Sequence, residues 1–189
     1  MLKIAVTGPE SCGKTSLAEG LAHHYGVSFI PEFAREYLLN KKGIYAFSDL
    51  DFIADGQIHA IQLAIKNQNN LLISDTEMLV MSIWSDVKFG KVSSYIQNAL
   101  IIQKFDHYFI CDTDIPWEAD PLRENEHDRD FLLKCYLEKA KKMNYSYTLL
   151  SGNHQTRLKK AVEIIDHLLN TKNATGRLPS HIWIRSGNR

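Results

Sequence analysis

The stretch GPESCGKT, residues 8 to 15, constrains this chain more than any other part of its sequence. It has the spacing G-x-x-x-x-G-K-[ST] and directly follows the apolar run Leu2 to Val6. The two glycines allow backbone conformations closed to residues with a Cβ, so that consecutive N–H groups can turn toward phosphate oxygens. The lysine supplies a positive charge for the β- and γ-phosphates, and the threonine supplies a hydroxyl for Mg²⁺. The pattern predicts a phosphate-binding loop between a strand and a helix.

The next segment carries Leu17, Leu21 and Tyr25 at helical spacing, so the positive N-terminus of a helix would also face the bound anion. Lys14 is expected to act in catalysis as well as in binding, and Thr15 is expected to ligate Mg²⁺. The residues expected to bind the nucleotide here are Gly8, Glu10, Ser11, Cys12, Gly13, Lys14, Thr15 and Ser16.

The composition is that of an ordinary globular domain. Of 189 residues, 44% are hydrophobic and 23% are charged, and the formal net charge of zero gives no global field that would favour nucleic acid. No apolar stretch approaches the roughly 20 residues that span a bilayer, and the first residues lead into a strand rather than a signal peptide. Cys12, Cys111 and Cys135 are too scattered for a disulfide framework. We therefore expect a cytoplasmic protein with reduced cysteines that binds neither nucleic acid nor membrane.

Short apolar runs alternate with longer helical patterns along the chain. Helical spacing of apolar residues is clearest near 53–64, 132–143 and 158–169. The alternation predicts an α/β fold, a five-stranded parallel sheet with helices on both faces. The runs typical of buried strands lie near 2–7, 27–30, 71–75, 107–111 and 146–150.

No repeat or internal linker interrupts this series, so residues 1–170 are expected to form one domain. Residues 171–189 contain Lys172 and three arginines but no carboxylate, and they are expected to form a basic tail. The sequence does not decide whether this tail is a flexible end, docks through Ile182-Trp183-Ile184, or is an appended sequence.

Carboxylates follow two of the predicted strands, at the edge where parallel sheets bind ligands. Asp75 ends the third strand and is expected to meet Mg²⁺ directly or through water, although its neighbours Thr76 and Glu77 could simply cap the next helix. Glu32 ends the second strand, and Arg35 follows on the first turn of a helix. The carboxylate could accept a proton from an acceptor hydroxyl and the arginine could hold substrate oxygens, or the two could form a weak solvated ion pair.

Residues 117–129 are highly charged, lack strand periodicity and precede a helix, which is typical of a small lid. Arg123 and Arg129 could swing over the triphosphate and stabilise charge on the transferring phosphoryl group, or the segment could be ordinary solvated surface. After the last strand, Thr156 and Arg157 are expected to contact the adenine of ATP, or only to cap and begin the final helix.

Together these segments resemble the ribosylnicotinamide kinase domain of the NadR family, within the P-loop kinases, over roughly residues 2–169. The resemblance is carried by GPESCGKT, PEFAREYL, LLISDTE, DTDIPWEADPLRENEHDR and SGNHQTRLKKAVEII. It implies transfer of the γ-phosphate of ATP, with Mg²⁺, to the 5′-hydroxyl of nicotinamide riboside. NadR proteins commonly carry a nucleotidyltransferase domain with an H-x-G-H type motif, which this sequence lacks. Neither adenylyl transfer nor repressor activity is therefore expected.

Within this resemblance, Glu32 is the preferred base and Asp75 the preferred Mg²⁺ ligand, although the two roles could be reversed. The substrate ring would be a flat cation that attracts an aromatic face, for which Trp117 is preferred, with Tyr37 and Trp84 behind it. Two rivals stay open: a kinase for another nucleoside or small hydroxyl compound, and a nucleotide-dependent switch or ATPase. The base preference of the riboside, the choice of ATP over GTP and the oligomeric state are not determined by the sequence.

Overall fold

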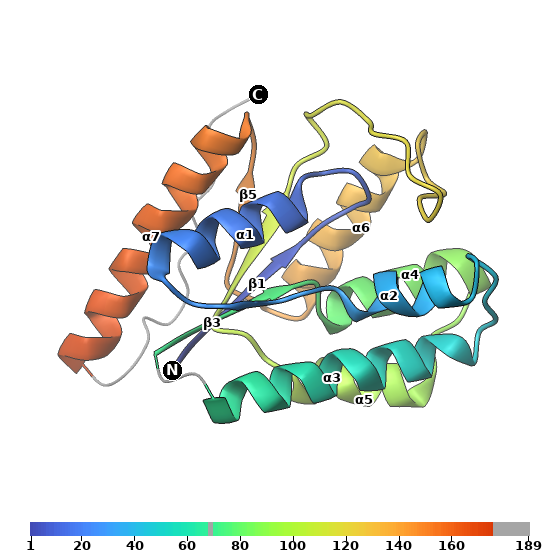
Figure 1. Ribbon diagram of the computed structural model, residues 1–189, viewed down its shortest axis with the longest axis horizontal. Coiled ribbons are helices and arrows are strands. Elements are labelled where there is room, and N and C mark those ends of the chain that lie inside the picture. Colours follow the sequence, from blue (N-terminus) through green and yellow to red (C-terminus); the bar gives the residue numbers. More distant parts are fainter. Residues whose placement is uncertain (68–69, 176–189) are drawn as a thin grey trace.

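The computed structural model of the protein describes residues 1–67 and 70–175 (Figure 1). Strands and helices alternate along the chain as β1 (Leu2–Thr7), α1 (Lys14–Tyr25), β2 (Phe29–Ile30), α2 (Phe33–Asn40), α3 (Asp49–Asn67), β3 (Leu71–Asp75), α4 (Met78–Phe89), α5 (Ser94–Ile102), β4 (His107–Cys111), α6 (Arg129–Lys142), β5 (Tyr147–Leu150) and α7 (His154–Thr175). No helix in this described part of the chain is both long and apolar enough to cross a membrane.

The five strands form one parallel sheet in the order β2-β3-β1-β4-β5, which confirms the predicted fold class. β1 lies at the centre, and its register pairs Val6 with Asp75 of β3 and Thr7 with Ile110 of β4. Nearly every residue of β1, β3 and β4 is buried, as expected for a parallel sheet covered on both faces. The pairing places the end of β3 beside the start of the phosphate loop.

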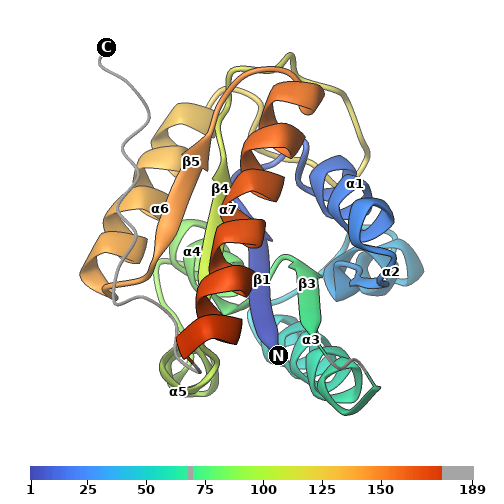
Figure 2. The same ribbon diagram turned by 90° about the vertical axis from the view of Figure 1, so that its left-hand side faces the viewer.

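Alternate side chains of each strand enter two separate cores. Ile4 and Val6 of β1 pack with α1 and α7, whereas Ala5 packs with α2 to α6 on the other face. The same alternation separates Ile73 from Leu72 in β3. Figure 2 shows α7 crossing in front of β4 and β1 on the first of these faces. The helices therefore fix the sheet from both sides and leave its carboxyl edge to the connecting loops.

Two boundaries and one helix differ from what the sequence predicted. β2 is shorter than the apolar run that predicted it, and α5, between β3 and β4, was not anticipated. α7 continues to Thr175, so the boundary expected at residue 170 falls inside a helix. Its last turns are held at the start of β1, because Lys172 donates to the Met1 carbonyl and lies 3.7 Å from Asp106. The rest of the expected basic tail, with Ile182-Trp183-Ile184, lies outside the described residues.

Glu77 caps α4, as one of the two sequence interpretations held. Its Oε2 accepts a 2.6 Å hydrogen bond from the Leu79 N–H, while its Oε1 is buried without a partner. Burial disfavours the charged form and raises the pKa of Glu77 to about 7. Between pH 4.5 and pH 7 the folded protein therefore keeps a proton on Glu77, whereas the unfolded chain, in which the pKa has its ordinary value of 4.5, has already released it. Stability from this group is therefore full below pH 4.5 and is lost as the pH rises through 7.

We expect Glu77→Gln to raise the free energy of unfolding at pH 8 by about 1–3 kcal/mol, measured by urea unfolding, because the neutral amide keeps the cap and removes the buried charge. At pH 4.5 the two proteins should have similar stability. Glu163→Gln, the same change on the exposed face of α7, is the control and should show no such pH-dependent gain. A gain that is equal at both pH values would contradict this account.

Candidate active site

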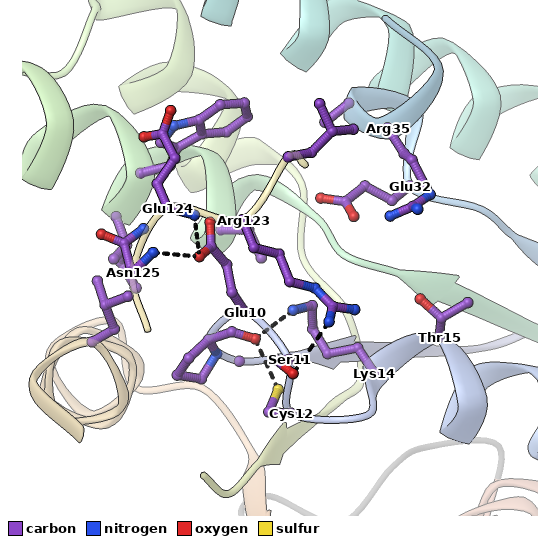
Figure 3. Close-up of a pocket in the computed structure, with 18 of the residues that line it drawn as sticks. Glu10, Ser11, Cys12, Lys14, Thr15, Glu32, Arg35, Arg123, Glu124 and Asn125 are labelled. Carbon is purple, nitrogen blue, oxygen red and sulfur yellow. Dashed lines mark hydrogen bonds between the residues drawn. The ribbon is translucent and has the colours of Figure 1, made fainter. Parts of the chain in front are cut away.

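A cleft of about 860 Å³ opens at the carboxyl ends of β1, β2 and β3. The structure brings Lys14, Glu32 and Asp75, which come from three separate segments, to this one cleft. Arg35 and Arg123 also line it (Figure 3). All eight residues expected from the phosphate loop are among the lining: Gly8, Glu10, Ser11, Cys12, Gly13, Lys14, Thr15 and Ser16.

The loop has the backbone that its glycines were expected to allow. Gly13 has φ of 77° and Gly8 has φ of 136°, and Ser11 between them also has a positive φ of 51°. A Cβ on Gly8 would lie 2.9 Å from the Cys111 carbonyl oxygen, so no larger residue fits there. No side chain caps the N-terminus of α1. The first N–H groups of this helix are therefore available to an anion.

Thr15 and Asp75 form the polar pair expected for a Mg²⁺ site. The Thr15 hydroxyl donates a 2.6 Å hydrogen bond to Asp75 Oδ2, while Asp75 Oδ1 is buried without a hydrogen-bond partner. A hydroxyl beside a carboxylate with an unsatisfied oxygen is a donor set that suits this cation. Within residues 1–67 and 70–175, no three His, Cys, Asp or Glu side chains cluster to hold a metal by themselves. The residues therefore fit an ion that takes its remaining ligands from phosphate and water.

The two carboxylates share an electrostatic environment with Lys14. Burial raises the pKa of Glu32, the charge of Asp75 raises it further, and Lys14 and Arg35 act in the opposite direction. Burial likewise raises the pKa of Asp75 against the effect of Lys14. Burial alone would lower the pKa of Lys14, but the negative charges around it, from Cys12, Glu32 and Asp75, raise it. The cleft thus combines a firmly protonated lysine with two carboxyl groups of raised basicity.

Gln57 of α3 was not identified from the sequence. Its side chain is buried, and its Oε1 accepts a 2.8 Å hydrogen bond from the Phe33 N–H, at the start of α2 directly after Glu32. Its Nε2 donates to the Ser74 hydroxyl, next to Asp75, at 3.3 Å. One amide therefore ties the loop of Glu32 to the end of β3. The sequence could have indicated Gln57, because it is a polar residue on the stripe of α3 that otherwise carries Leu50, Ile53, Ala54 and Ile61.

Two side chains of the phosphate loop bind the segment 117–129, which was expected to form a lid. Glu10 Oε2 accepts hydrogen bonds from the N–H groups of Glu124 and Asn125 at 3.0 and 2.9 Å (Figure 3). The Ser11 hydroxyl accepts one from the Glu118 N–H at 2.8 Å. The segment therefore lies over the cleft, held by positions that the loop motif leaves free.

The arginines of the cleft also join this segment to the rest of the site. Arg123 Nη1 donates to the Ser11 hydroxyl at 3.2 Å. Arg35 donates to Asp120 Oδ2 at 2.7 Å, so its ion-pair partner is in the lid segment rather than on its own helix. Arg35 thus links α2 to the segment that covers the cleft.

The expected aromatic contacts are distributed differently. Tyr37 is not among the residues that line the cleft, because its hydroxyl donates to Asp49 Oδ1 at 2.6 Å, between α2 and α3. Trp117 is also outside the lining, and the guanidinium carbons of Arg123 and Arg129 lie 5.9 and 6.0 Å from its ring centroid. Trp84 of α4, the third aromatic residue considered, does line the cleft.

Three other residues expected at the site lie outside the lining of the cleft. Thr156 donates from its N–H and hydroxyl to Asn153 Oδ1 at 2.9 and 3.0 Å, which is the geometry of a helix start and matches the capping interpretation. Arg129 and Arg157 point their guanidinium groups at backbone carbonyls of Ser11 and Cys12, respectively. Both arginines therefore contact the phosphate loop on the side that faces away from the cleft.

Comparison with known proteins identifies the family of the chain. A family model described as "AAA domain" matches residues 3–157. The NadR protein of Salmonella typhimurium, described as a trifunctional NAD biosynthesis and regulator protein, is 25% identical over 173 residues. This match covers 88% of the chain and 42% of NadR, so the chain spans less than half the length of that relative.

Solved structures show the same fold. NadR protein in complex with NR, and in complex with NAD and AMP-PNP, superpose with TM-scores of 0.71 and 0.73 at 17% identity. Each covers 96% of this chain, and 54% and 51% of the NadR chains. A deoxyadenosine kinase from M. mycoides with bound dATP has a TM-score of 0.64 at 15% identity, over 87% of this chain and 100% of its own. The sheet and its helices are therefore those of P-loop kinases.

Gln57→Leu should lower the free energy of unfolding by about 1–3 kcal/mol, because the Phe33 N–H loses its acceptor while the site stays too buried for water to replace it fully. Gln62→Leu on the exposed face of the same helix is the matched control and should change stability by about 0.5 kcal/mol or less. Urea unfolding of the three proteins measures the difference. Equal effects of the two substitutions would show that Gln57 does not tie these loops together.

Proposed function

The chain belongs to the AAA domain family of P-loop proteins, and we propose that within this family it is a kinase that transfers the γ-phosphate of ATP to the 5′-hydroxyl of nicotinamide riboside. The observation that carries the proposal is the single cleft in which Glu32 and Asp75 lie in the field of Lys14. A nucleotide switch needs the phosphate loop and its metal ligands, but it has no need of a second carboxylate on the acceptor side. The relation to NadR, and the structure of NadR with NR, support the riboside as acceptor.

The roles that we propose follow from the geometry. Lys14 and the N–H groups of the loop bind the phosphates, and Thr15 and Asp75 would hold Mg²⁺. When bound, this ion would neutralise charge on the β- and γ-phosphates. Glu32 accepts the proton of the attacking hydroxyl, because its raised pKa makes it a better base than an ordinary carboxylate. Arg123, in the segment over the cleft, adds positive charge near the transferring group.

The acceptor would occupy the part of the cleft between α2, α4 and the lid segment. Its wall includes the apolar side chains of Leu38, Val80, Ile83, Trp84 and Leu122. A flat pyridinium ring suits such a wall, and Trp84 offers the aromatic face that the sequence suggested for Trp117. Arg35, held by Asp120, lies where it can meet ribose oxygens. We propose that the reaction takes place in the cytoplasm.

The direct test incubates the purified protein with ATP, Mg²⁺ and a panel of acceptors, and identifies products by mass. We expect phosphorylation of nicotinamide riboside and much slower reaction of deoxyadenosine, thymidylate and shikimate. Lys14→Ala is the control and should lose turnover. Phosphorylation of a different acceptor alone, or ATP hydrolysis with no transfer, would refute the proposed substrate.

Substitutions of the two carboxylates separate their roles. We expect Glu32→Gln to lower kcat by about 10²–10⁴-fold, since it removes the base, while leaving the Mg²⁺ dependence unchanged. The activity of the parent should fall as the pH drops through the raised pKa of Glu32, and the variant should lose this limb. Asp75→Asn should instead require more Mg²⁺. A shifted Mg²⁺ requirement in Glu32→Gln would reverse the two assignments.

A further inference from the structure

We propose that Arg157 is a positioning residue that fixes the phosphate loop in its anion-binding shape. The sequence suggested that this residue contacts ATP, but it does not line the cleft. Its side chain is only 3% exposed and lies behind the loop, on the side of α7. The inference rests on the proposed function only in taking this loop to bind the phosphates of ATP.

The guanidinium group of Arg157 connects three loops. Its Nη1 donates to the Cys12 carbonyl in the phosphate loop at 2.6 Å. Its Nε donates to the Gly152 carbonyl after β5 at 2.7 Å, and its Nη2 donates to the Asp112 carbonyl after β4 at 3.1 Å. Nη2 also pairs with the carboxylate of Asp114. A planar group with several fixed donors is suited to hold such an arrangement, whereas the single ammonium of a lysine is not.

The contact with Cys12 sets the direction of a peptide group. In a planar trans peptide the C=O of one residue and the N–H of the next point in opposite directions. With its carbonyl held by Arg157, the peptide between Cys12 and Gly13 points the Gly13 N–H away from α7, toward the side of the loop that lines the cleft. A Cβ on Gly13 would lie 3.7 Å from Arg157 Nη1, which shows how closely the guanidinium packs on this peptide.

Arg129 acts on the preceding peptide in the same way. Its Nη2 donates to the Ser11 carbonyl at 3.0 Å and so turns the Cys12 N–H to the opposite side. Two consecutive carbonyls of the loop are thus held by arginines of α6 and α7, neither of which lines the cleft. Their donors keep the loop ordered before a phosphate arrives, which lowers the cost of binding.

The charge of Arg157 is matched within its own surroundings. Asp114 pairs with it directly, so the pair adds little net charge beneath the loop. The effect of Arg157 on phosphate binding is therefore expected to come from geometry rather than from attraction at a distance. In this respect Arg157 differs from Lys14, whose charged side chain lies in the cleft itself.

The test measures the affinities of ATP, ADP and adenosine by calorimetry for the parent, Arg157→Met, Arg157→Lys and Asp114→Asn. We expect ATP and ADP to bind Arg157→Met about 10- to 100-fold more weakly, because one or two N–H groups no longer point at phosphate oxygens. The affinity for adenosine should be unchanged. Arg157→Lys and Asp114→Asn should show the same phosphate-dependent pattern to a smaller extent.

Ile165→Ala is the control for destabilisation of α7, because Ile165 is fully buried in the core beneath that helix, about two turns further along it than Arg157. It should lower the melting temperature and leave the affinities for ATP and ADP intact. If Arg157→Met fails to fold, the lysine and asparagine variants carry the test.

Equal losses of affinity for ATP and adenosine would show that Arg157 contacts the base, and unchanged affinities for all three ligands would show a merely structural role. Either result overturns the proposal. Because no riboside is used, the outcome does not depend on the acceptor. A protein that shows the expected pattern but phosphorylates no riboside would refute the proposed function and not this inference.

Discussion

The structure depends on the parallel pairing of β1 with β3. This register places Asp75 opposite Val6, two residues before the phosphate loop begins, and so brings a carboxylate from residue 75 within 2.6 Å of the Thr15 hydroxyl. If this register shifted by one residue, the Asp75 side chain would point into one of the hydrophobic cores, and an apolar side chain would face the cleft in its place. The same burial that fixes the register also keeps water from the Asp75 carboxylate. Fold and chemistry are therefore specified by the same strand pair.

The cleft contains buried carboxylates whose charged forms lower the stability of the folded protein. Burial raises the pKa of both Glu32 and Asp75, although the charge of Lys14 acts in the opposite direction on each. Lys14 is the central compensating charge, and it donates meanwhile to the Pro9 carbonyl of its own loop. Such an arrangement sacrifices stability for reactivity, as functional sites commonly do. It also explains why a ligand that brings a cation and phosphates would fit this site.

The loop motif leaves several positions open, and this chain uses them to connect the loop to its surroundings. Glu10 and Ser11 hold the segment that covers the cleft through its backbone N–H groups. From the other side, Arg129 and Arg157 hold consecutive carbonyls. The same short loop thus faces the cleft, the lid segment and two helices. A change in any one of these contacts can shift the N–H groups that would bind phosphate, because all of the contacts are made by the same short loop.

The sequence alone determined the fold class, the five strands and the residues of the phosphate loop, because apolar periodicity and glycine spacing are local properties of the chain. It also placed Glu32 and Asp75 at the right edge, since parallel strands end together. Only the tertiary structure decided which side chains point into the cleft. It turned Tyr37 to Asp49, put Trp84 rather than Trp117 in the wall, and set Arg157 behind the loop. It also revealed Gln57 as the tie between two loops. These outcomes depend on partners that are distant in the chain or on the rotation of a helix about its axis, and no local pattern encodes either.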